Sequence, residues 1–100
     1  LLYALSGNIL TVGTKKIELL NGKYERPRLF RIGGTNYVSV NDLSTQKAYL
    51  YSDKGNLIKD FPVESVSPIA IDVDLDRTVW IVTEKSPTEI VVFSVRKLEN

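Results

Sequence analysis

The stretch AYLYSDKGN at residues 48–56 contains the two features that recur along this chain, a short apolar strand and an immediate tight turn. Tyr49 and Tyr51 alternate with Ala48 and Leu50, and this period of two is typical of a β-strand. Gly55 can adopt the positive φ that a short hairpin turn requires. The stretch therefore predicts a strand that ends in a hairpin.

The same pattern extends outward in both directions. Runs rich in Val, Ile, Tyr, Phe and Thr are separated by Gly, Asn, Asp, Ser or Pro at intervals of about eight to twelve residues. No segment sustains helical periodicity. We expect an all-β fold, an antiparallel meander of about ten short strands. The predicted strands are residues 2–5, 8–12, 15–20, 28–32, 36–41, 47–51, 57–61, 68–72, 78–83 and 89–95.

An internal repeat links the two halves of the chain. Residues 27–32 align with 68–73 at an offset of 41, and residues 37–40 align with 79–82 at an offset of 42. This period is typical of a four-stranded propeller blade of about 40 to 45 residues. We expect one β-repeat domain over residues 1–100, a fragment of a larger chain with about two propeller-like blades in a partial or open β-propeller. The expected segments are a partial blade at 1–26 and blades at 27–67 and 68–100.

A single blade cannot bury both of its faces, so such a fragment should leave an outer sheet face uncovered. The partners that we expect are other blades of the parent protein or another protein. A homodimer of the fragment is a further way to cover this face.

The composition excludes several chemistries. The chain has no Cys and no His, so it has no disulfide, no thiol nucleophile, no His general base and no zinc site built from these ligands. We expect it not to be an enzyme. No apolar run approaches the roughly 20 residues of a membrane-spanning helix, so we expect no membrane contact by this segment.

Charge is distributed unevenly along the chain. The net charge of +1 divides into +4 for residues 1–50 and −3 for residues 51–100. A basic half can attract nucleic acid. Basic residues that alternate along strands are more typical of a solvated sheet face, and nucleic-acid binding is therefore not favoured.

One region resembles a known family. Residues 48–63, AYLYSDKGNLIKDFPV, and residues 67–76, SPIAIDVDLD, follow the order of strand, Gly-Asn turn, strand ending in Phe-Pro and Asp-rich loop. Residues 36–83 resemble FG-GAP or VCBS repeats of β-propellers, especially the C-terminal repeats of large uncharacterised Bacteroidetes proteins. The resemblance implies a non-catalytic structural or protein-interaction scaffold, from an envelope-associated or secreted protein located in the periplasm or cell envelope. It also leaves open a cation-dependent adhesion or carbohydrate-binding module.

The candidate metal ligands are Asp72, Asp74 and Asp76, because alternating carboxylates on a tight loop can bind calcium. The family pattern has Gly after the third Asp, where this chain has Arg77, and a carboxylate near the position of Trp80. We therefore expect no metal or other cofactor and interpret two of the carboxylates as acceptors for backbone N–H groups of the turn. A calcium site remains the alternative.

The candidate ligand-stacking residues are Tyr49, Tyr51 and Trp80. Tyr49 and Tyr51 share one strand face and, with Tyr37, predict an aromatic strip that could stack on a sugar. Trp80 lies on the face opposite to Val79. Packing between sheets is the competing interpretation for all of these side chains, and it is the one that we favour.

Overall fold

The computed structural model describes residues 2–99 of the chain. Within this part there are ten β-strands and no helix, which confirms the all-β prediction. It follows that no helix of residues 2–99 is long and apolar enough to cross a membrane. The strands are β1 (Tyr3–Ser6), β2 (Ile9–Val12), β3 (Lys15–Glu18), β4 (Arg28–Ile32), β5 (Thr35–Asp42), β6 (Lys47–Ser52), β7 (Val63–Glu64), β8 (Ala70–Val73), β9 (Val79–Ser86) and β10 (Glu89–Val95).

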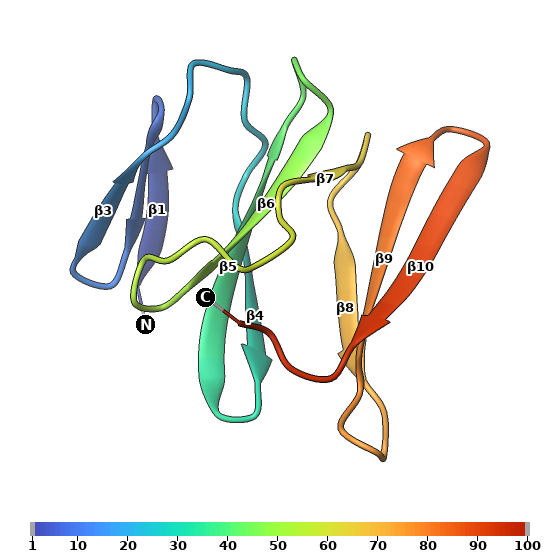
Figure 1. The fold of residues 1–100 in the computed structure, drawn as a ribbon. Coiled ribbons are helices and arrows are strands. Elements are labelled where there is room, and N and C mark those ends of the chain that lie inside the picture. The colour runs from blue at the N-terminus through green and yellow to red at the C-terminus, as the bar shows by residue number, and fades with distance from the viewer. Residues whose placement is uncertain (1, 100) are drawn as a thin grey trace.

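The strands form three antiparallel sheets, each a meander in chain order. We call them the N-terminal sheet (β1–β2–β3), the central sheet (β4–β5–β6–β7) and the C-terminal sheet (β10–β9–β8). Figure 1 shows them side by side, with the central sheet between the other two. They lie within residues 1–26, 27–67 and 68–100 respectively, and Leu1 and Asn100 are outside the described residues.

The central sheet is covered on both faces, and β5 shows this most clearly. Val38 and Val40 point towards the N-terminal sheet and are at most 1% exposed. Tyr37, one residue out of phase, points towards the C-terminal sheet. Successive side chains of a strand face opposite ways, so one apolar strand can supply two cores.

Two hydrophobic cores hold the three sheets together. The first lies between the N-terminal and central sheets and contains Leu10, Val12, Leu19, Val38, Val40 and Tyr51. The second lies between the central and C-terminal sheets and contains Tyr37, Ala48, Leu50, Ile58, Phe61, Ile69, Val79, Ile81 and Leu98. Burial of these side chains is the main favourable term in the folding of such a stack.

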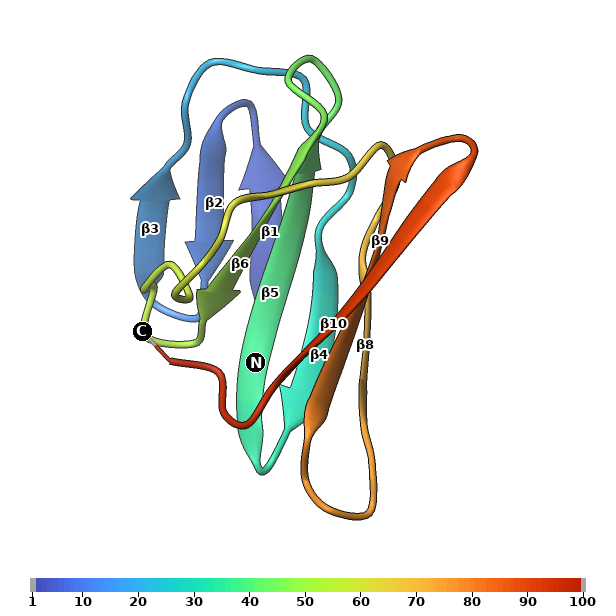
Figure 2. The same cartoon turned by 45° about the vertical axis from the view of Figure 1, so that its right-hand side comes forward.

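The C-terminal segment closes the second core. After β10 the chain crosses to the central sheet (Figure 2), where Leu98 is 8% exposed. The Lys59 backbone N–H donates to the Glu99 carbonyl oxygen at 2.6 Å. The segment therefore ties the end of the described chain to the loop between β6 and β7.

A buried carboxylate at the end of β5 binds the loop that leads from the N-terminal sheet to the central sheet. Asp42, at the end of β5, is 1% exposed. Its oxygens accept hydrogen bonds from the Lys23 N–H at 3.0 Å, from the Ser44 N–H at 3.0 Å and hydroxyl at 2.7 Å, and from the Thr45 hydroxyl at 2.7 Å. Burial by itself raises the pKa of Asp42, but these four bonds favour the charged form and together lower the pKa to about 2.

The predicted strand at residues 57–61 is wrong. Only Leu57 forms a bridge, to Tyr51, and the fourth strand of this sheet is the short β7 that follows Pro62. The reason is tertiary: Ile58 and Phe61 are both buried in the second core, a spacing of three that an extended strand cannot place on one face. Asp60, with φ of 73°, makes the bend that this requires.

Candidate interaction face

Asp74 and Asp76 lie in the turn between β8 and β9, and Asp72 lies within β8. One oxygen of Asp74 accepts the backbone N–H groups of Asp76 at 2.9 Å and Thr78 at 3.0 Å. Asp72 accepts the Val73 N–H at 2.8 Å. Asp74 thus has the predicted turn role, whereas the bond to Asp72 is formed within β8.

The second oxygen of Asp74 holds Trp80. The indole Nε1–H donates to it at 2.9 Å. This bond is the main cause of a lowered pKa of the exposed Asp74 carboxyl; desolvation opposes it, and the bonds from Thr78 and Asp76 lower the pKa further. Asp74 therefore both shapes the turn and orients the only tryptophan of the chain.

The three aspartates do not converge on a common point. Within residues 2–99, no three acidic side chains lie close enough together to hold a metal ion. The turn also has Arg77 in the left-handed region, with φ of 63°, where the family pattern has Gly. The calcium alternative thus finds no ligand set in this turn.

The two tyrosines pack against the first core, with Tyr51 buried and Tyr49 half-buried, which corrects the ligand-stacking hypothesis for Tyr51. Their rings are stacked with centroids 6.4 Å apart and lie against the core between the N-terminal and central sheets. Burial, followed by the neighbouring Tyr49 and Tyr24, raises the pKa of Tyr51 to about 12. Tyr37 lies in the other core, so it does not extend the strip. A sugar could reach the buried Tyr51 ring only by parting the two sheets.

Trp80 has the opposite environment. It is 39% exposed on the face of the C-terminal sheet that points away from the central sheet. Packing between sheets, the interpretation that the sequence favoured, is therefore not realised within residues 2–99. Two side chains that sequence reasoning did not single out, Ile90 at 67% and Val92 at 55% exposure, lie on the same face.

This outer face is continuous across three strands. Cross-strand pairs place Ala70 beside Val82 and Val82 beside Val92, while Asp72 lies beside Trp80 and Glu84 beside Ile90. We define the outer face as the apolar residues Ala70, Trp80, Val82, Ile90 and Val92. Large apolar faces are unusual on solvated surfaces and mark interaction sites.

The corresponding face of the N-terminal sheet is much more polar. Its outward side chains are Ala4, Ser6, Ile9, Thr11, Lys16 and Glu18. The two ends of the three-sheet stack therefore differ: one end is suited to water and the other to a partner.

A comparison of the β5–β6 hairpin with the β9–β10 hairpin shows which face of the central sheet corresponds to the outer face. Strands β4 and β8 run in the same direction (Figure 1), and the cross-strand pairs Val38–Tyr51 and Ile81–Phe93 both face the preceding sheet, so we match these two pairs. This match gives an offset of 42 for β6 to β10 and of 43 for β5 to β9, where the sequence alignment had 42 for β5 to β9. Tyr37 then corresponds to Trp80, Ser39 to Val82, Ala48 to Ile90 and Leu50 to Val92.

The change of the β5-to-β9 offset from 42 to 43 decides which face of the central sheet corresponds to the outer face. Tyr37, Ser39, Ala48 and Leu50 are the residues that the central sheet buries beneath the C-terminal sheet, and each is at most 9% exposed. The outer face of the C-terminal sheet repeats this buried face. A slip of one residue would have placed the same side chains on the opposite side of the sheet, and similarity of apolar letters cannot resolve it.

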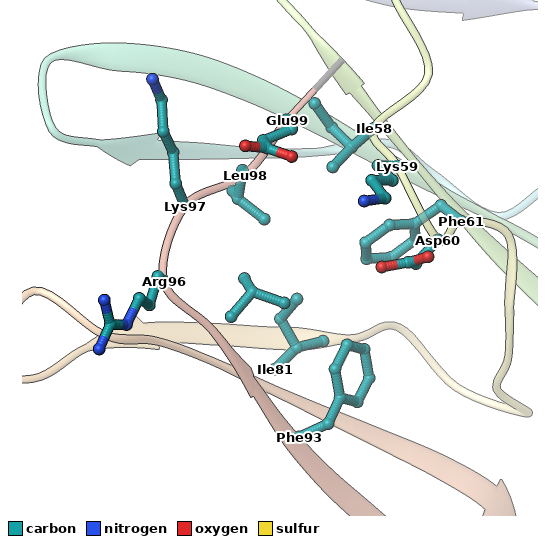
Figure 3. Close-up of a pocket in the computed structure, with 11 residues that line it drawn as sticks. Ile58, Lys59, Asp60, Phe61, Ile81, Phe93, Arg96, Lys97, Leu98 and Glu99 are labelled. Carbon is teal, nitrogen blue, oxygen red and sulfur yellow. The ribbon is translucent and has the colours of Figure 1, made fainter.

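The molecule also has a cavity of ≈ 300 Å³ between the central and C-terminal sheets (Figure 3). Its apolar wall consists of Ile58, Phe61, Ile81, Phe93 and Leu98, which belong to the second core or pack on it. Every buried side-chain nitrogen and oxygen in the described part has a hydrogen-bond partner. The rest of the lining consists mainly of exposed charged side chains, Lys59, Asp60, Arg96, Lys97 and Glu99.

The outer face is therefore an apolar surface that no other sheet of the described residues covers. Comparisons with models of protein families, with curated proteins and with solved structures found no match to this chain.

Proposed function

We propose that this chain is a non-catalytic scaffold module that binds another protein through the outer face of the C-terminal sheet. The observation that carries the proposal is the correspondence between this exposed face and the face that the central sheet buries. A surface that repeats a buried sheet interface is suited to a further sheet.

The finer architecture belongs to the same proposal. Three meanders that stack in chain order, with a period near 42 residues, support a partial or open β-propeller. The family resemblance favours a larger envelope-associated or secreted parent protein, in which such a module would join neighbouring blades or bind a separate protein.

Retention of the folded chain on a phenyl resin tests the proposal. Ile90→Lys with Val92→Lys should markedly reduce retention, because both side chains are mostly exposed and form half of the bulky surface of the outer face. The matched control is Ala4→Lys with Ser6→Lys, which adds the same charge to the exposed edge strand β1 of the N-terminal sheet. This control should be retained like the parent chain.

Far-UV circular dichroism should show that all three proteins are folded. Equal retention of the parent and the Ile90/Val92 variant would contradict the proposal, because the outer face would then not be an adhesive surface in solution.

A further inference from the structure

We propose that a second cavity, between the β4–β5 turn, the β8–β9 turn and the segment after β10, binds a small organic phosphate monoester. In this arrangement the phosphate group lies against Arg77, Arg96 and Lys97, and the organic group lies on an apolar wall. The site is separate from the outer face, so the inference goes beyond the proposed function and does not depend on it.

The second cavity has a volume of ≈ 600 Å³ and lies where three segments of the chain converge. Thr35 follows the turn between β4 and β5, Arg77 belongs to the turn between β8 and β9, and Lys97 belongs to the segment after β10. Figure 1 shows the two turns and this segment at the same end of the molecule. The volume is within the range of cavities that bind small molecules, about 300 to 1,000 Å³.

Part of the wall of the second cavity is apolar. Tyr37, Val79 and Leu98 line it, and these members of the second core are at most 9% exposed. Ile32, which packs on the same core, also lines it. Apolar walls with a few polar groups are typical of sites for small organic molecules. The wall therefore favours a ligand with an apolar group over an inorganic ion.

The charged lining of the second cavity is basic. Arg77, Arg96 and Lys97 line it, and no acidic side chain of residues 2–99 does. The two arginines also meet at a neighbouring hollow, which Asp76 and Thr78 complete. The three cations and this one carboxylate give a net charge of +2, which matches a phosphate monoester better than a carboxylate ligand. Arginine forks bind phosphate oxygens through paired N–H donors.

Two details associate these cations with the second cavity. Arg96 and Lys97 also line the ≈ 300 Å³ cavity, but Figure 3 shows their charged ends directed away from Phe61 and Phe93 on its apolar wall. Arg77 has a φ of 63°, a conformation that glycine adopts at lower cost. Residues held in such conformations are concentrated at ligand sites, and the Arg77 side chain lines this one.

Titration with phenyl phosphate, followed by the amide NMR shifts of the chain, tests the inference. The Kd should be about 1 mM or tighter, and the shifted amides should include Thr35, Arg77 and Lys97. Inorganic phosphate and benzoate should each bind at least about fivefold more weakly, because the first lacks the ring and the second carries a single charge.

Arg77→Gln with Arg96→Gln should weaken phenyl phosphate binding at least about tenfold, because charge-assisted hydrogen bonds are lost. The matched control is Arg26→Gln with Arg28→Gln, which removes two exposed arginines outside the cavity and should bind like the parent. Arg77→Gly guards against misfolding, since glycine suits this φ. It should melt close to the parent and still bind phenyl phosphate more weakly.

Each other outcome overturns the inference. A parent chain that shows no shifts at about 10 mM phenyl phosphate has no such site. Binding that the Arg77/Arg96 variant retains uses another surface, and equal weakening in the Arg26/Arg28 control shows a general effect of net charge. Inorganic phosphate or benzoate that binds as tightly as phenyl phosphate contradicts the ligand class.

Discussion

At the scale of single residues, Asp42 has the most demanding environment in the chain. Its carboxylate accepts four hydrogen bonds from the loop after the N-terminal sheet and from the turn after β5. The backbone at Gly22 approaches so closely that a Cβ there would lie 2.7 Å from both carboxylate oxygens. The close approach of Asp42 thus explains why glycine is required at position 22.

Asp42→Asn should destabilise the fold by about 2 kcal/mol at neutral pH, because hydrogen bonds to a charged acceptor are lost. The folded pKa of about 2 is lower than the ordinary 3.8. The contribution of Asp42 is therefore fully present above pH 4 and is lost as pH falls from about 4 to about 2. Urea denaturation of parent and variant at pH 7, 4 and 2.5 should show two free energies of unfolding that converge in acid.

Asp76→Asn is the matched control, since it removes the same charge from an exposed turn position. It should leave the free energy of unfolding near that of the parent at pH 7. A gap between parent and Asp42→Asn that stays constant down to pH 2.5 would show that the charge of Asp42 is not the stabilising property.

At the scale of elements, the turn between β8 and β9 connects a local motif to the outer face. Asp74 accepts two backbone N–H groups of the turn and the indole N–H of Trp80, which lies on the next strand. The sequence shows this motif as a row of alternating aspartates. That one of them reaches Trp80 depends on the pairing of β8 with β9, which brings position 80 back beside Asp72.

Asp74→Ala should release the indole ring of Trp80. Acrylamide quenching of Trp80 should increase and its emission should shift to longer wavelength, because the ring loses its hydrogen bond to the turn and becomes more mobile and hydrated. Asp76→Ala, two residues further along the turn, should change neither signal. Identical spectra for the parent and Asp74→Ala would contradict this role.

Strand existence and strand register were not equally predictable. Nine of the ten predicted strands have a counterpart, because alternation and turn residues are local signals. The exception at residues 57–61 fails because Ile58 and Phe61 fill the core between two sheets. Register was misjudged by one residue in β9, since Val79, Trp80, Ile81 and Val82 are all apolar and allow either phase.

At the scale of the whole molecule, the central sheet contributes to both hydrophobic cores, so we expect the three sheets to unfold together. Strand β5 contributes Val40 to the first core and Tyr37 to the second. The C-terminal segment adds Leu98 and a backbone bond to the loop before β7. Loss of either core should therefore destabilise the other.

Val40→Ala and Ile81→Ala should each lower the midpoint of the same unfolding transition, at a cost of about 2 to 4 kcal/mol for the removal of buried methyl groups. Trp80 fluorescence reports on the C-terminal sheet and far-UV circular dichroism reports on all three. The two signals should coincide in every variant, including Val40→Ala, whose site is in the other core.

Leu75→Ala is the control, because Leu75 is fully exposed, and the midpoint should change little. Separate transitions in Val40→Ala, with Trp80 unfolding at the midpoint of the parent, would show that the C-terminal sheet folds independently of the first core.

By itself, the sequence determined the all-β class, most strands, a turn-acceptor role within the aspartate row, and the absence of His and Cys chemistry. These features depend on composition or on neighbours within a few residues. Only the tertiary structure decided that Tyr51 lies inside while Trp80, Ile90 and Val92 lie outside. Alternation divides a strand into two faces, but which face is covered depends on a sheet that lies tens of residues away in the sequence.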